Sequence, residues 1–120
     1  MKCIPNNAPT NVAAIDERDP NAGNASHVYV IQYGGPNDVC RIQFQHGPRG
    51  LATSMPGIFD DDLFAILQDR YEGYMDGRFA CEESAQVLRL IKEARAMLGL
   101  RVVRRIAQGV LGVNEQHKST

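Results

Sequence analysis

The sequence predicts an α+β fold, in which a small antiparallel sheet is followed by a two-helix hairpin. The run "HVYVIQY" at 27–33 is β-branched and aromatic, and the run "VCRIQFQ" at 39–45 alternates apolar and polar residues. Apolar residues then recur at helical spacing from about 60 to 76 and from about 81 to 108. With 120 residues, the chain is long enough for one domain with one modest core.

Residues 1–25 are rich in Asn, Ala, Pro and Asp and show no periodic pattern. Turn-forming residues without periodicity favour irregular structure. A flexible N-terminal arm is therefore expected over 1–25. Within it, the segment "NVAAI" at 11–15 is a candidate for a short edge strand.

The two strand-like runs are joined by "GGPND" at 34–38, a short glycine-containing connection that is typical of an antiparallel hairpin. In the second run, Cys40, Ile42 and Phe44 alternate with polar residues and are expected to face inward. A lone hairpin is barely stable in water. Its apolar face is therefore expected to be covered by helices or by another subunit.

A first helix is expected to begin near Asp60 or Asp61, after a loop at 46–57 that is rich in glycine and proline. The acidic run "DDD" at 60–62 suits a helix N-terminus, and we favour this interpretation over a Mg²⁺ site. Gly77 is expected to end the helix. The apolar stripe of this helix consists of Leu63, Ile66, Leu67 and Tyr71.

A second helix is expected from about 81 to 108, with Gly109 and Gly112 at its end. Its long stripe follows three- and four-residue steps through Ser84, Val87, Ile91, Ala94, Leu98, Arg101, Arg105 and Gln108. Leu90 and Met97 widen this stripe. A two-helix hairpin with a small sheet does not cover so wide a face, so we expect a homodimer or a higher homo-oligomer.

Arg101 and Arg105 continue the apolar stripe toward the end of this helix. One interpretation is ordinary, since helix C-termini attract arginine and long side chains reach water. However, Arg104 points away from the stripe and suffices for that role, whereas Arg101 stands a full turn inside the helix. Burying unpaired guanidinium groups is unfavourable, and phosphate matches their bidentate geometry. We therefore expect paired phosphate sites at a subunit boundary.

Tyr71, Tyr74 and Phe79 lie around the turn between the two helices. An aromatic surface beside arginines is what a nucleotide requires, because the base stacks and the phosphates accept hydrogen bonds. The alternative, that these residues are ordinary core aromatics, stays open at this point.

Composition and spacing disfavour several other function classes. The net charge of −1 disfavours a nucleic-acid polymer as a partner. Cys3, Cys40 and Cys81 are widely separated, so neither a zinc cluster nor a disulfide frame is expected. No apolar run reaches the length of a membrane span and no signal peptide is recognised, so a soluble cytoplasmic protein is expected. Without a catalytic constellation or cofactor motif, we expect no enzyme, no cofactor and no metal site.

The motifs "HGPRG", "DDDLFAILQDRYEGYMDGRFACEESA" and "LRVVRRIAQGVLG" together resemble the Thoeris anti-defence one family, over about residues 27–113. Members of this family are small phage proteins whose helical hairpin is shared with anti-CBASS two proteins. The resemblance implies a nucleotide sponge that acts without catalysis in the host bacterial cytosol. Its implied ligand is glycocyclic ADP-ribose, an immune signal made by TIR-domain proteins. Some members form hexamers and also hold CBASS cyclic di- or trinucleotides at a separate site.

The resemblance also implies roles for individual residues. Arg101 and Arg105 would hold the diphosphate of the ligand, and Tyr74 stands where the family has a stacking aromatic, usually Phe. Ser84 stands where many relatives carry Asn, and the shorter serine side chain shortens one polar contact. Arg49, in the loop between the sheet and the helices, is a weaker candidate for a second phosphate contact.

The sequence thus predicts a flexible arm at 1–25, a single α+β nucleotide-binding domain at 26–113 and a frayed tail at 114–120. One alternative function stays open, namely a homo-oligomeric scaffold or protein-interaction module that has no small-molecule ligand. A nucleotide that co-purifies with the protein would distinguish the two functions.

Overall fold

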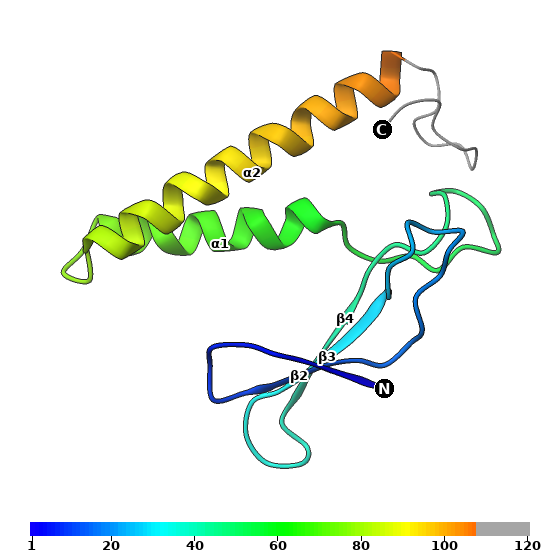
Figure 1. Cartoon of the computed structure of the whole chain (residues 1–120), viewed down its shortest axis with the longest axis horizontal. Helices are drawn as coiled ribbons and strands as arrows, with labels where there is room; N and C mark the ends of the chain where they lie inside the picture. Colours follow the sequence, from blue (N-terminus) through cyan, green and yellow to red (C-terminus); the bar gives the residue numbers. More distant parts are fainter. Residues whose placement is uncertain (108–120) are drawn as a thin grey trace. The chain divides into compact units, whose positions relative to one another are not determined.

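The computed structural model describes the backbone of residues 1–107 and the side chains of residues 1–104. The chain forms two compact units, of which the first spans 1–58 and the second begins at Phe59. The first unit holds an antiparallel sheet, and the second holds two helices (Figure 1). The predicted α+β class, a small antiparallel sheet followed by a helical hairpin, is therefore confirmed.

The sheet has its strands in the order β1-β2-β3-β4, each antiparallel to the next. The strands are β1 (Lys2–Ile4), β2 (Asn11–Ala14), β3 (Val28–Gln32) and β4 (Val39–Gln43). β3 and β4 form the predicted hairpin, with Val30 opposite Arg41. Beyond β4, a bridge between Phe44 and Ile58 brings the end of the following loop back to the sheet.

The prediction of a flexible arm at 1–25 is wrong, because this segment supplies β1 and β2. β2 contains most of the suggested edge strand, but it lies inside the sheet, between β1 and β3. The turn-forming residues at 5–10 connect two paired strands, so they form a hairpin loop rather than a tether. Ala14 at the end of β2 is 2% exposed, which anchors the segment to the sheet. The predicted domain at 26–113 therefore omits half of the sheet.

The inward face predicted for β4 is correct only in part. Phe44 packs edge-to-face against Tyr29, with ring centroids 5.8 Å apart, and Ile42 is half-buried. Cys40 is exposed, and so is Val39 beside the hairpin turn. The tip of the β3–β4 hairpin therefore extends beyond the region where the two rings pack.

α1 (Asp60–Met75) begins after Phe59, whose backbone is still extended. The backbone N–H of Phe59 donates to Asp62 Oδ2 at 2.8 Å. Asp62, and not Asp60 or Asp61 as expected, therefore supplies the side-chain hydrogen bond at the helix start. The carboxylates of the first turn also suit the positive end of the helix dipole.

α2 (Glu82–Ala107) begins within one residue of its predicted start, and Ala107 is also the last residue whose backbone the structure describes. The two helices lie side by side and run in opposite directions, joined by the short segment 76–81 (Figure 1). Ile91 is the most buried side chain described for α2 and is 8% exposed. The predicted helix terminators Gly109 and Gly112 and the predicted tail at 114–120 lie outside the described residues.

The side of α1 that faces α2 differs from the predicted stripe. Ile66 and Leu67, which were expected to be covered, are 57% and 40% exposed. Asp61 and Gln68 instead both bond to Arg95 of α2. These contacts turn one side of α1 toward α2. Its residues follow one another at three- and four-residue steps and are Asp61, Phe64, Gln68, Tyr71 and Met75.

Candidate functional site

One side of the helical hairpin carries large apolar side chains that the described residues of the hairpin leave exposed. The exposed fractions are 36% for Val87, 53% for Leu90 and 62% for Met97 on α2, and 40% for Leu67 on α1. On each helix these residues lie about a quarter to a third of a turn before the residues that face the other helix. In antiparallel helices the same rotation brings both groups to one side of the hairpin. These four residues are hereafter the uncovered face.

Arg101 lies on the same side of α2 as the uncovered face, one turn beyond Met97. Its side chain is exposed, and within the described part of the chain it forms no ion pair. Arg105 follows one helical turn later, but its side chain lies outside the described residues. The predicted pairing of the two arginines therefore stays a prediction, while the placement of Arg101 beside an apolar surface is observed.

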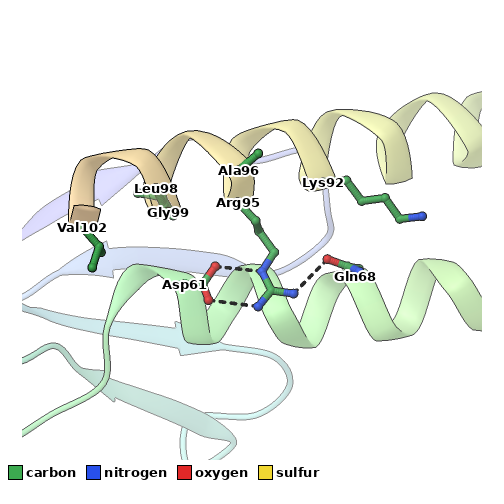
Figure 2. Close-up of a pocket in the computed structure, with 8 residues that line it drawn as sticks. All are labelled: Asp61, Gln68, Lys92, Arg95, Ala96, Leu98, Gly99 and Val102. Atoms are coloured by element: carbon green, nitrogen blue, oxygen red, sulfur yellow. Dashed lines mark hydrogen bonds and ion pairs between the residues drawn. The ribbon is translucent and has the colours of Figure 1, made fainter. Parts of the chain in front are cut away.

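Arg95 is the arginine that the structure places between the two helices. Its Nε donates to Asp61 Oδ1 at 2.8 Å, its Nη2 to Asp61 Oδ2 at 3.0 Å, and its Nη1 to Gln68 Oε1 at 2.9 Å (Figure 2). The hydrogen bonds from Arg95 hold the pKa of Asp61 below its ordinary value of 3.8. Because its charge is already matched by a carboxylate, Arg95 is a structural cation rather than a candidate phosphate ligand.

An open groove of about 470 Å³ surrounds this ion pair. Figure 2 shows its lining residues, which are Asp61, Gln68, Lys92, Arg95, Ala96, Leu98, Gly99 and Val102. Apart from Arg95, the cation of the groove is Lys92. A groove with one matched arginine and one lysine around a carboxylate is a poor site for a diphosphate, because Asp61 would repel it.

The predicted aromatic residues lie near the turn of the hairpin. Tyr74 is half-buried, its hydroxyl accepts a hydrogen bond from Arg70 Nη2 at 2.6 Å, and its ring packs edge-to-face on Tyr71. Phe79 is 71% exposed within the turn itself. Tyr74 thus packs against Tyr71 with part of its ring exposed, and Phe79 presents an exposed apolar surface, so the predicted stacking role of both residues stays a prediction.

Ser84 stands in the first turn of α2, where its hydroxyl lies 3.2 Å from the sulfur of Cys81. Its backbone N–H points to the same sulfur at 3.4 Å. Arg49 belongs to the first unit, in an exposed loop between Gly47 and Gly50, both of which have positive φ. The structure thus groups Tyr74, Phe79 and Ser84 at the turn of the hairpin, whereas Arg49 belongs to the other unit.

The two halves of the predicted site are far apart within one hairpin. Ser84 and Arg101 are separated by 17 residues of continuous helix, which corresponds to about 25 Å at the rise of an α-helix. Arg101 lies toward the end of α2 that packs beside the start of α1, whereas Tyr74 and Phe79 lie at the turn. A single chain therefore cannot bring Arg101 and the turn residues onto one small nucleotide.

Comparison with known proteins bears on the predicted resemblance. No family model matches the chain. A curated relative, Thoeris anti-defense 1 from Bacillus phage SBSphiJ7, is 29% identical to the chain over 94 residues. The resemblance to the Thoeris anti-defence one family is confirmed. The aligned region covers 78% of this chain but only 64% of the Thoeris anti-defense 1 relative.

The Asp61–Arg95 pair is a feature of this chain that the sequence prediction missed. The sequence pattern indicates a helix cap at Asp60 or Asp61 and no role for Arg95. Arg95 follows Ile91 by four residues and precedes Leu98 by three, so helical spacing alone places it on the buried side.

None of the helices in the described residues is both long and apolar enough to cross a membrane.

Proposed function

We propose that this protein is a phage anti-defence protein that binds and sequesters glycocyclic ADP-ribose in the host bacterial cytosol, and so prevents activation of a Thoeris effector. It acts by binding and not by catalysis. The name of the curated relative supports the anti-defence role. The structural observation that carries the ligand assignment is the position of Arg101, a cation exposed on the same side of α2 as a broad apolar surface.

The separation of the two half-sites leads to a specific arrangement of two chains. If two hairpins pair through their uncovered faces about a two-fold axis, the Arg101 end of one copy meets the turn of the other. Val87, Leu90 and Met97 are then buried between copies, which removes apolar surface from water at about 25 cal/mol per Å². Each pair has two equivalent sites, in which one copy contributes arginines and the other contributes Tyr74, Phe79 and Ser84.

The chemistry of such a site suits a cyclic nucleotide that carries a diphosphate, such as glycocyclic ADP-ribose. Guanidinium groups of Arg101 and Arg105 offer planar, bidentate donors to phosphate oxygens. An exposed aromatic such as Phe79 offers a stacking surface for the base. Water is displaced by the surrounding apolar residues, which strengthens the charge interaction by lowering the local dielectric.

Isothermal titration calorimetry with purified glycocyclic ADP-ribose tests the proposal. The double variant Arg101→Ala and Arg105→Ala should bind at least about 30-fold more weakly, since removing one side of a buried charged contact costs about 2–5 kcal/mol. Arg89→Ala is the matched control, because Arg89 lies on another side of α2 and pairs with Glu93. Wild-type affinity in the double variant would refute the site.

A sponge must return its ligand intact, which separates binding from catalysis. After the complex is heat-denatured, mass spectrometry should recover glycocyclic ADP-ribose with unchanged mass and retention. A cleaved or rearranged product would show that the protein is an enzyme. Cyclic di- or trinucleotides, the second ligand class that the family implies, should bind without competing with glycocyclic ADP-ribose if their site is separate.

The exposed apolar residues also favour a second candidate function, a homo-oligomeric scaffold without a small ligand. Both functions require self-association, so oligomeric state does not distinguish them. Native mass spectrometry of protein purified from phage-infected cells that produce the signal does distinguish them. A retained nucleotide supports the sponge, and an assembly of bare chains supports the scaffold.

A further inference from the structure

A cluster of nitrogen and oxygen donors lies in the first unit, outside the site described above. Asp16, His27 and His46 each present one ligand atom, and these atoms all lie within 4.8 Å of one another. The three residues come from the segment after β2, the start of β3 and the loop after β4. Neither the proposed nucleotide site nor the packing of the sheet accounts for this convergence.

Backbone hydrogen bonds hold each of the three residues in place. The Asp16 carboxylate accepts hydrogen bonds from the backbone N–H groups of His27 and Val28, at 2.9–3.0 Å. The carbonyl of His27 accepts from the N–H of Phe44 at 2.8 Å. His46 and Met55 exchange backbone hydrogen bonds at 2.8 and 2.9 Å. The cluster is therefore fixed by the sheet and is not a chance meeting of mobile surface side chains.

His27 is a buried polar side chain that lacks a partner. It is 8% exposed, and its Nδ1 is buried without a hydrogen bond to any described residue. Leaving such a nitrogen unsatisfied costs about 1–3 kcal/mol. An unpartnered, buried imidazole nitrogen beside a carboxylate is a group that a metal ion would satisfy.

His46 has the second feature that is typical of a metal ligand. Its Nε2 lies 2.7 Å from Asp19 Oδ2, an arrangement in which a carboxylate fixes the tautomer and leaves Nδ1 as an electron-pair donor. Asp19 is itself held by backbone hydrogen bonds with Ala25 and Asn24. The loop at 16–26 thus carries one candidate ligand and one group that orients another.

We propose that Asp16, His27 and His46 bind one divalent cation of the Zn²⁺ class, with Asp19 as the residue that orients His46. Two imidazoles and one carboxylate form the mixed nitrogen and oxygen donor set that borderline cations prefer. The carboxylates of Asp16 and Asp19 balance the two charges of such an ion. Of the three proposed ligands, Asp16 also lines an open groove of about 480 Å³, together with Ser26, Lys2 and Arg18.

Binding requires one imidazole ring to turn. The rings of His27 and His46 are stacked, with centroids 4.0 Å apart and planes inclined by 8°. Because the lone pair of an imidazole nitrogen lies in the ring plane, two parallel rings cannot direct their lone pairs at one ion. His46 is the ring that turns, since it is half-buried whereas His27 is buried, and the half-buried Asp19 side chain turns with it so that the contact to Nε2 is kept. Loss of the ring stack is therefore a signature of binding.

The test uses the full chain, stripped of metal with a chelator, and Zn²⁺ or Co²⁺ as the probe. Calorimetry should detect one tight ion per chain, and Co²⁺ should give the visible absorption of a low-symmetry nitrogen and oxygen site. His46→Gln should abolish this binding, and Asp19→Asn should weaken it about 10–100-fold. In nuclear magnetic resonance spectra, the ring protons of His27 should shift on binding as the stack is lost.

Two controls make the outcome decisive. The triple variant Cys3→Ser, Cys40→Ser and Cys81→Ser removes the exposed thiols, and His117→Gln removes the remaining histidine. Both should bind the ion as the wild type does. If either loses it, or if a His46→Gln protein with native circular dichroism binds with wild-type affinity, the proposal is overturned. Because no nucleotide is present, this result is independent of the proposed sponge function.

Discussion

Asp61 in the first turn of α1 and Arg95 in the middle of α2 form a two-point ion pair, with nitrogen–oxygen distances of 2.8 and 3.0 Å. The pair joins residues 34 positions apart and sets which side of each helix faces the other. By doing so, it leaves Leu67, Leu90 and Met97 outside the hairpin contact. The uncovered face is thus a consequence of this polar contact.

Breaking this pair should destabilise the helical hairpin. Asp61→Ala leaves the Arg95 guanidinium without its anion, and we expect a lower thermal midpoint by circular dichroism. Asp69→Ala is the control, since Asp69 is an exposed acid of the same helix. Equal midpoints for the two variants would show that the Asp61–Arg95 pair does not hold the hairpin.

The same pair predicts a dependence of stability on pH. The pKa of Asp61 in the folded chain lies below 3.8, mainly because of the hydrogen bonds from Arg95. A carboxyl with a lowered folded pKa stabilises the fold above its ordinary pKa and loses that contribution as pH falls through the folded value. In urea titrations, the stability difference between wild type and Asp61→Asn should therefore shrink as pH falls below 3.8. A difference that is constant down to the acid limit would contradict this assignment.

Two glycines should respond in opposite ways to substitution by alanine. A Cβ at Gly57 would collide with the carbonyl of Gln43 at the bridge beyond β4, so Gly57→Ala should destabilise the chain by about 1–3 kcal/mol. A Cβ at Gly73 in α1 meets nothing within 4 Å, and Gly73→Ala should stabilise the helix by about 0.5–1 kcal/mol. Urea denaturation measures both, and a harmless Gly57→Ala would show that the bridge is loose.

Charge placed on the uncovered face should prevent self-association and leave the hairpin folded. Met97→Lys inserts an ammonium group where two copies are expected to meet. Val103→Lys is the matched control, because Val103 is as exposed as Met97 but lies on another side of α2. Analytical ultracentrifugation should show smaller species for Met97→Lys only. Dissociation by both variants, or by neither, would place the interface elsewhere.

The sequence was sufficient where local pattern decides structure. Alternation in 27–45 identified the β3–β4 hairpin, and helical spacing located the start of α2 to within one residue. It was insufficient where pairing between distant segments decides. The 1–14 segment has weak strand propensity, and its strands form by pairing, β2 with the edge of β3 and β1 with β2.

The candidate site shows the same division between local and distant information. Spacing puts Arg101 on the same side of α2 as Met97, and both side chains are exposed. It did not reveal that Asp61 and Arg95 would select the contact side of α1, since that choice depends on a partner 34 residues away. The histidine cluster likewise combines His27 and His46 with Asp16 from separate segments, so no spacing motif announces it.

The central claim is that two copies of the hairpin complete each nucleotide site, with arginines from one copy and turn residues from the other. The most direct measurement combines two inactive variants, Arg101→Ala with Arg105→Ala on one chain and Phe79→Ala with Ser84→Ala on the other. The two chains are co-expressed with different tags, and mixed assemblies are isolated by tandem purification. Calorimetry with glycocyclic ADP-ribose should show binding restored to about half of the wild-type stoichiometry, because each mixed pair has one intact site of two. Mixed assemblies that form but bind no ligand would contradict the shared site.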